Sequence, residues 1–289
     1  MKIIQKRKIW FAMAIVLSVA SIVFLSVWQL KFGIDFTGGS LQELNFNANR
    51  PSVTEVQDKL SGLDLGGLIV QPVGDSGMIL RFQNTGSELH KKVLDKLGAN
   101  AEELRFDSIG PSIGAELKKK TFYAIVVSII IILIYIAFAF RRVSRPVESW
   151  KYGLGSVIAL AFNVLVVLGT FSVLGKFANI EINAPFIAAL LTILGYTIND
   201  TIVVFDRIRE NLPKSEEDFE GTINTSINQT LVRSINTSST VILVLVAIFL
   251  FGGASIKDFT LAMAIGVFVG TWSSIFLASP LLILFQKKA

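Results

Sequence analysis

Residues 195–211 read GYTINDTIVVFDRIREN and contain a carboxyl group where an apolar helix is expected. Asp200 lies six residues before the charged run that begins at Asp206, which is roughly 9 Å inside the helix end at 1.5 Å per residue. A charged side chain at membrane depth costs at least about 2.5–3.5 kcal/mol on insertion scales, and an aspartate is too short to reach the interface. The stretch therefore predicts a membrane-spanning helix that buries a carboxyl group with a partner and a function.

The polar residues around Asp200 fall on one face of this helix. They are spaced i, i+3, i+4, i+7 and i+8: Thr192, Gly195, Tyr196, Asn199 and Asp200. A second stripe enters the next apolar segment, with its members three or four residues apart: Ser226, Gln229, Thr230, Arg233, Thr237 and Thr240. A row of small residues in the last apolar segment is interpreted as helix packing: Ala262, Gly266, Gly270 and Ser274. Packing alone does not require the Asp or the Arg of the first two stripes.

Arg233 is the candidate partner of Asp200, because an arginine brought close to a buried carboxyl group changes which protonation state is favoured. Further candidates for hydrogen-bond or water partners are Asn199, Thr197, Thr237 and Thr240. An alternative for Arg233 is a positive-inside anchor at the cytoplasmic start of the fifth span. The charged residues near the end of the stretch 195–211 are interpreted as an interfacial cluster at helical spacing rather than as a functional site: Asp206, Arg207 and Arg209.

The rest of the chain has the composition of a membrane protein. Of its 289 residues, 52% are hydrophobic and the mean hydropathy is +0.61, which exceeds what a soluble domain of this length needs. Uncharged stretches long enough to cross a hydrocarbon core of about 30 Å occur at 9–30, 121–140, 152–175, 182–199, 234–256 and 259–286. We therefore expect an α-helical polytopic membrane protein with six transmembrane helices.

The net charge of +5 and the pI near 9.4 come from basic residues at helix ends, so no nucleic-acid partner is expected. Arg141, Arg142 and Arg145 lie between the second and third spans, whereas the short loops on the opposite side carry only Lys176 and Lys257. This positive-inside pattern predicts that both termini are cytoplasmic. The chain has no cysteine, which excludes disulfides and thiolate metal sites.

One large polar segment, residues 31–120, separates the first two spans and is expected on the periplasmic side. Strands are expected at 41–46, 68–73, 78–82 and 101–109, and helices at 52–63 and 87–97. The order β-α-β-β-α-β is typical of a small ferredoxin-like α+β domain. The chain is therefore divided into 1–30, the tail and first helix; 31–120, the external domain; and 121–289, the other five helices.

Residues 32–40, FGIDFTGGS, join the first span to this domain. Their glycines do not fit a phosphate-binding loop, since neither GxxxxGK[ST] nor a GxGxxG after a strand is present. Asp35 is expected to cap backbone N–H groups in a tight turn. Gly33, Gly38 and Gly39 are expected to form a hinge, because glycine tolerates large φ/ψ changes. Enzyme signatures are otherwise absent, and no catalytic function is expected.

Five stretches in order along the chain resemble the SecF family, the smaller half of the bacterial SecD–SecF accessory complex of the Sec translocase. They are FGIDFTGGS, GYTINDTIVVFDRIREN, NQTLVRSINTSSTV, FGGASIKDFTLAMAIG and GTWSSIFLASPLL. The resemblance implies an RND-like half with six spans, an external domain after the first, and action driven by proton-motive force without a cofactor. It also implies that Asp200 and Arg233 occupy positions implicated in proton passage.

The same resemblance implies a place in the bacterial cytoplasmic (inner) membrane, with SecD, the SecYEG channel and unfolded exported polypeptide as partners. YajC and YidC are further candidates. Two other functions stay open: a subunit of an RND-type small-molecule exporter, and a scaffold for SecD that moves no charge. With about 90 residues of external domain and six spans, the chain is too small to enclose a drug pocket alone. On the leading hypothesis, Asp200 carries the proton whose passage drives motion of the external domain.

Overall fold

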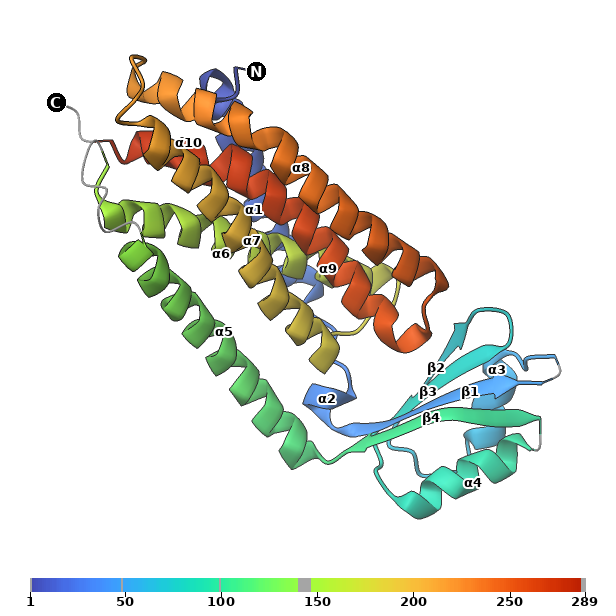
Figure 1. Cartoon of the computed structure of the whole chain (residues 1–289). Coiled ribbons are helices and arrows are strands. Elements are labelled where there is room, and N and C mark those ends of the chain that lie inside the picture. Colours follow the sequence, from blue (N-terminus) through green and yellow to red (C-terminus); the bar gives the residue numbers. More distant parts are fainter. Residues whose placement is uncertain (1, 48, 99, 140–146, 287–289) are drawn as a thin grey trace. The chain divides into compact units, whose positions relative to one another are not determined.

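The chain forms two compact units in the computed structural model (Figure 1). The structure describes residues 2–47, 49–98, 100–139 and 147–286. The first unit combines Met1–Lys31 with Tyr123–Ala289 and contains most of the long helices, and the second, Phe32–Phe122, contains a four-stranded sheet. Part of the predicted orientation rests on basic residues that lie outside the described ranges: Arg141, Arg142 and Arg145.

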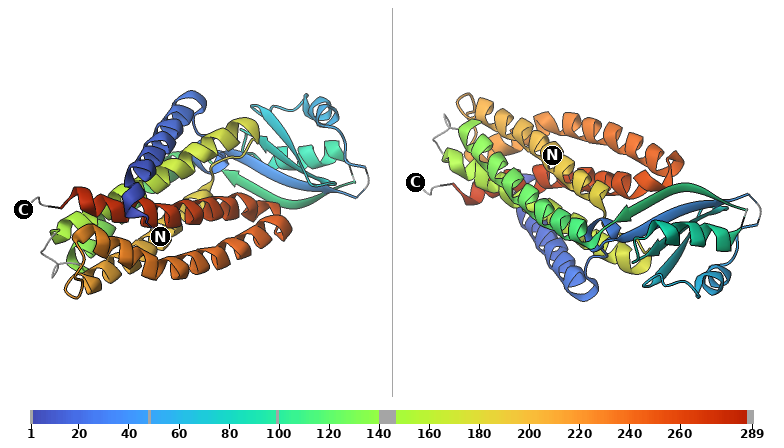
Figure 2. Two further views of the ribbon diagram at one scale, coloured as in Figure 1. Left: turned by 90° about the horizontal axis from the view of Figure 1, so that it is seen from above. Right: turned by 90° about the horizontal axis from the view of Figure 1, so that it is seen from below.

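Six helical segments within the described ranges are long and apolar enough to cross a membrane, which confirms the predicted number and a multi-pass membrane protein. They are α1 (Arg7–Trp28), α5 (Pro111–Ala139), α6 (Ser149–Phe177), α7 (Ala184–Asn211), α8 (Phe219–Phe251) and α9 (Ala254–Ser273). The last of these continues through a π-helical turn, η2 (Ser274–Ala278), into α10 (Ser279–Leu284). The views in Figures 1 and 2 show α8 and α9 side by side.

Helix α8 begins at residue 219, fifteen residues before the uncharged stretch that starts at 234. Its N-cap is Asp218, whose side chain accepts a hydrogen bond from the Gly221 backbone N–H at 2.8 Å. Such a cap satisfies one of the free N–H groups at a helix start. Ile223 and Ile227 are fully buried, so this first part of α8 also packs into the core of its unit. Arg233, which was expected at the start of the fifth span, therefore lies within a longer helix.

The predicted packing role of small residues in the last span is confirmed at two positions. A Cβ atom added at Gly266 would lie 2.2 Å from Cδ1 of Ile193. One added at Gly270 would lie 2.3 Å from the hydroxyl oxygen of Thr197. Both contacts are far shorter than van der Waals distance, so α7 and α9 approach each other only because these residues have no side chain.

The last span is interrupted by η2, which the sequence analysis did not predict. Pro280 has no backbone N–H to donate to the preceding turn, and the helix widens just before it. The Ser279 hydroxyl donates to the backbone carbonyl of Ser274 at 3.0 Å. Ser274 itself contacts α7, where its hydroxyl lies 2.7 Å from that of Thr201.

The second unit contains β1 (Gly39–Phe46), α3 (Val53–Leu60), β2 (Leu68–Val73), β3 (Gly77–Phe82), α4 (Ser87–Leu97) and β4 (Ala101–Ile109). Its strands form an antiparallel sheet in the order β2-β3-β1-β4. The predicted capping box is present: the Ser52 hydroxyl accepts from the Glu55 N–H at 3.2 Å, and Glu55 accepts from the Ser52 N–H at 2.8 Å. A separate apolar core lies between sheet and helices: Leu44, Val56, Leu60, Leu80 and Val93, among others.

Residues 32–40 form one short helical turn, α2 (Ile34–Thr37), where a tight turn was expected, and Asp35 lies in its first turn. Gly33 has an ordinary φ of −76°. Gly38 has φ +76°, and a Cβ atom there would lie 2.8 Å from Cα of Pro111. Gly39 has φ +130°. Backbone conformation and close packing therefore explain Gly38 and Gly39, whereas Gly33 is not explained in this way.

Candidate functional site

The carboxyl group of Asp200 is buried in the first unit. Asp200 is 9% exposed and lies on α7, eleven residues before this helix ends at Asn211. The Ser234 hydroxyl of α8 donates to Oδ1 of Asp200 at 2.5 Å. The other carboxyl oxygen, Oδ2, is also buried and makes no hydrogen bond to any residue in the described ranges. One oxygen is therefore held, and the other is left for a proton, a water or a second donor.

Ser234 belongs to a row of buried hydroxyl residues on α8, spaced by four: Ser226, Thr230, Ser234 and Ser238. Three of the four hydroxyls donate to the backbone carbonyl of the residue four positions earlier, at 2.7–3.1 Å. This is the usual bond for Ser and Thr inside helices. Ser234 is the exception, since its hydroxyl donates across to α7. The site therefore depends on one hydroxyl that leaves its own helix.

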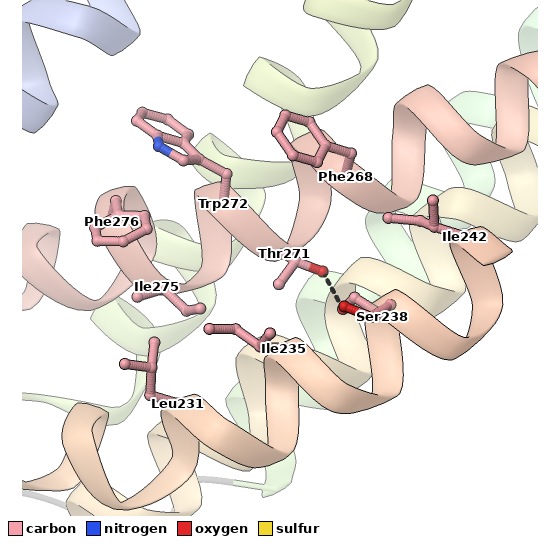
Figure 3. Close-up of a pocket in the computed structure, with 10 residues that line it drawn as sticks. Leu231, Ile235, Ser238, Ile242, Phe268, Thr271, Trp272, Ile275 and Phe276 are labelled. Carbon is pink, nitrogen blue, oxygen red and sulfur yellow. Dashed lines mark hydrogen bonds between the residues drawn. The ribbon is translucent and has the colours of Figure 1, made fainter.

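The next hydroxyl of this row connects the site to α9. The hydroxyl oxygens of Ser238 and Thr271 are 2.5 Å apart, and the Tyr196 hydroxyl donates to Ser238 at 3.5 Å. The Ser238–Thr271 pair borders a groove of about 210 Å³ between α8 and α9 (Figure 3). Apart from Ser238, Ser239 and Thr271, its lining is apolar: Leu231, Ile235, Ile242, Phe268, Trp272, Ile275 and Phe276. Such a lining offers no charge to bind an ion.

A second polar group lies next to Asp200 on α7 and faces other elements. The Asn163 amide of α6 donates to the Thr197 hydroxyl at 2.7 Å, and Thr201 contacts Ser274 of η2. The amide oxygen of Asn163 is buried and has no hydrogen-bond partner in the described part of the chain. Asp200 therefore lies on a helix that is hydrogen-bonded to α6, α8 and η2, which restricts its position.

None of the other predicted partners makes a hydrogen bond to the carboxyl group among the described residues, although Arg233 lies close enough to attract its negative charge. All four of the remaining candidates are exposed in this chain: Asn199, Arg233, Thr237 and Thr240. The Thr240 hydroxyl donates to the Thr237 carbonyl of its own helix at 2.8 Å. Thr197 is buried but bonds to Asn163. Ser234 was not among the predicted residues, yet its hydroxyl contacts Asp200. The spacing by four of Ser226, Thr230 and Ser234 marks a row of hydroxyl residues in the sequence but does not show which of them bonds to Asp200.

The exposed polar residues form a face of their own on the membrane helices. On α8 it consists of Gln229, Arg233, Asn236, Thr237 and Thr240. On α7 it consists of Thr192, Gly195 and Asn199, and a Cβ atom at Gly195 would meet nothing within 4 Å. We call these residues the open polar face. Polar groups at membrane depth normally face protein or water rather than lipid.

The charges at the end of α7 pair with one another. The distance from the Arg209 guanidinium to the Asp206 carboxylate is 2.5 Å. The Glu210 carboxylate lies 2.9 Å from the Arg207 guanidinium and 3.2 Å from the Lys214 ammonium group. Exposed pairs of this kind contribute about 0–1 kcal/mol each. Nowhere in the described ranges do three His, Cys, Asp or Glu side chains gather in a way that could hold a metal ion.

Comparison with known proteins shows extensive similarity. A sequence model of the family described as "Protein export membrane protein SecD/SecF, C-terminal" matches residues 89–288. The protein translocase subunit SecF of Thermobaculum terrenum is 40% identical over 303 residues, which cover 99% of this chain and 94% of that protein. The protein of the same name from Anaerolinea thermophila is 35% identical, with 99% of this chain and 94% of that protein covered.

Solved structures give the same result. The crystal structure of SecDF from Thermus thermophilus, a translocon-associated membrane protein, matches with a TM-score of 0.85 and 32% identity. A structure of SecDF in a super-membrane-facing form matches with a TM-score of 0.69 and 32% identity. The matches cover 97% and 98% of this chain but 38% of each SecDF chain. The chain therefore spans little more than a third of the SecDF chains that it resembles.

Proposed function

Because the chain belongs to the SecD/SecF family of protein export membrane proteins, we propose that it is the proton-driven SecF-type subunit of the Sec export machinery. The relatives that match it over nearly its whole length are protein translocase subunits, so its function is protein transport. In this proposal, proton passage at Asp200 drives late steps of polypeptide translocation across the bacterial cytoplasmic membrane. The chain itself catalyses no chemical reaction.

The observation that carries the proposal is the buried carboxyl group of Asp200 with one oxygen unbonded. A purely structural aspartate at this depth would be expected to have both oxygens hydrogen-bonded, since buried polar atoms without partners are destabilising. A carboxyl group that gains and loses a proton needs an oxygen on which the proton can reside. Oδ2 of Asp200 meets that requirement.

A second environment for the carboxyl group is available on α8. Arg233 precedes Ser234 directly, and successive residues on an α-helix are about 100° apart around its axis. A smaller movement of α8 against α7 would bring the Arg233 guanidinium to the second oxygen, Oδ2, while the Ser234 hydroxyl stays on Oδ1. The two arrangements would differ in proton occupancy at Asp200, so a proton gradient would favour one over the other.

The available energy is sufficient for such a switch. One elementary charge that crosses a potential of 100 mV gains about 2.3 kcal/mol. Since about 1.4 kcal/mol corresponds to a factor of ten, this shifts a balanced two-state equilibrium more than tenfold. The two SecDF structures match this chain with TM-scores of 0.85 and 0.69 at equal identity. Those SecDF structures thus differ in shape, which supports a function based on conformational change.

We place the sheet-containing unit, Phe32–Phe122, on the extracytoplasmic side as a ferredoxin-like domain between the first two spans. Its strand order β2-β3-β1-β4 and its element order β-α-β-β-α-β support this assignment. The distribution of Lys and Arg supports cytoplasmic termini. On the outside, the domain would make transient contact with the polypeptide that emerges from SecYEG, and YajC and YidC would be neighbours in the same membrane.

SecD is the proposed direct partner, and the open polar face supports it. Gly195 and Asn199 on α7 and Thr237 on α8 contact little within this chain, yet they lie in membrane-spanning helices. A second six-helix half would cover them and exclude lipid. The 38% share of the SecDF chains covered by this chain leaves room in those proteins for such a half.

The proposal is tested by the substitution Asp200→Asn, with Asp206→Asn as the matched control. Asn keeps the shape of the side chain and the hydrogen bond from Ser234 but cannot bind and release the proton. We expect the Asp200 variant to lose gradient-stimulated export in membrane vesicles while it still copurifies with SecD. The Asp206 variant loses one exposed ion pair and should export normally. Normal gradient-dependent export by Asp200→Asn would contradict proton passage and favour the scaffold function.

A further inference from the structure

We propose that Ser234 is a positioning residue that holds the Asp200 carboxyl group in both its protonated and its ionised form. This inference rests on the proposed role of Asp200 as the proton carrier. It adds a second residue to the site, one that neither binds the travelling proton nor carries a charge. Ser234 and Asp200 are 2% and 9% exposed, so water from bulk solvent does not replace their hydrogen bond.

The direction of the Ser234 hydroxyl is the first argument. Its neighbours in the buried row, Thr230 and Ser238, donate to the carbonyl four residues earlier, at 3.1 and 2.8 Å. The Ser234 hydroxyl gives up this bond and donates to Asp200 Oδ1 at 2.5 Å. Since the alternative bond is available to a serine in a helix, the contact with Asp200 must be the more favourable one in this arrangement.

The chemistry of a hydroxyl group is the second argument. A serine hydroxyl donates a hydrogen bond without carrying a charge, whereas an arginine or lysine donates with a positive charge. With the proton on Oδ2, Oδ1 is the carbonyl oxygen of the neutral acid and still accepts. Ser234 is therefore able to donate to Oδ1 in both protonation states. A fixed cation at this position would favour the carboxylate over the neutral acid.

The surroundings leave this task to Ser234. Neither α6 from Tyr152 to Gly175 nor the last span from Phe259 to Gln286 contains a charged residue. On α7 the nearest charge is Asp206, which pairs with Arg209. On α8 it is Arg233, which is exposed and makes no hydrogen bond to Asp200 among the described residues, but lies close enough to attract its negative charge. Ser234 thus fixes Oδ1, and Oδ2 is the oxygen that receives and releases the proton.

The experiment compares three variants in the intact complex with SecD: Ser234→Ala, Ser234→Thr and Thr230→Val. The first removes the hydroxyl, the second keeps it, and the third removes a buried hydroxyl that bonds only within its own helix. Gradient-stimulated export in vesicles is measured together with the labelling of Asp200 by a hydrophobic carbodiimide, which reacts with protonated carboxyl groups. Recovery of the complex reports on folding.

We expect Ser234→Ala to lower gradient-stimulated export about tenfold, the size expected for the loss of one hydrogen bond to a charged group. Its Asp200 labelling should change severalfold, because the carboxyl group is no longer held. Ser234→Thr and Thr230→Val should match the parent protein in both measurements. Equal defects in Ser234→Ala and Thr230→Val, or unchanged export and labelling in Ser234→Ala, would overturn the inference. If Asp200→Asn exports normally, the proposed function fails instead, whatever Ser234 does.

Discussion

At the scale of single residues, Gly270 of α9 illustrates how closely the helices around Asp200 are fitted. A Cβ atom there would lie 2.3 Å from the Thr197 hydroxyl and 2.9 Å from the Asn163 amide nitrogen. Gly270→Ala should therefore break the Asn163–Thr197 hydrogen bond and cost about 1–3 kcal/mol through overpacking. We expect a lower melting temperature of the purified complex. Gly253→Ala is the control, because its Cβ would meet nothing within 4 Å, and an equal loss there would contradict the packing argument.

The burial of Asp200 could be predicted from the sequence, but its contact with Ser234 could not. The cost of a carboxylate in hydrocarbon depends on the residue and its depth, both of which are visible in the sequence. The partner depends on the rotation of α8 about its own axis, which tertiary packing sets. Arg233 and Ser234 are neighbours in sequence but point about 100° apart, so the sequence predicted the helix that faces Asp200 but not the hydroxyl that bonds to it.

At the scale of elements, the same limit applies to helix ends. Uncharged stretches located all six spans, because hydrocarbon excludes charge irrespective of the fold. They did not show that α8 extends back to Phe219 or that the last span contains η2. Those features depend on the Asp218 cap and on Pro280, which are local signals inside and beside the apolar stretches. The hydropathy of a segment therefore predicted where a helix crosses the membrane better than where it begins.

The cap of α3 provides a test at this scale. Ser52→Ala removes the hydroxyl that accepts from the Glu55 N–H, and loss of such a cap costs about 1 kcal/mol. In an isolated segment of about 90 residues, this should lower the melting temperature by roughly 4–8 °C, as measured by circular dichroism. Ser61→Ala, at the exposed C-cap, is the control and should change little. A segment 31–120 without cooperative melting would contradict an independently folded external unit.

At the scale of the whole molecule, the distribution of small and polar residues separates contacts within the chain from contacts with another chain. The space beside Gly266 and Gly270 is occupied by Ile193 and Thr197 of the same chain. Gly195, on the open polar face of α7, has no neighbour of this kind. The relatives that match this chain over nearly their whole length are translocase subunits, which favours a function in protein export over one in small-molecule export. On the proposed function, the open polar face is the surface through which the chain would join SecD.

Gly195→Val should therefore damage assembly without damaging the chain itself. The added side chain meets nothing within 4 Å of its Cβ inside this chain, but it would keep a partner helix from approaching α7 closely. We expect the variant to reach the membrane in normal amount and to lose SecD during purification in mild detergent. Gly266→Val should lower the amount of the chain itself, because its side chain would overlap Ile193. Full recovery of SecD with Gly195→Val would show that another face carries the contact. The open polar face would then have to line water instead, since lipid would offer no hydrogen-bond partner to exposed amide groups such as that of Asn199.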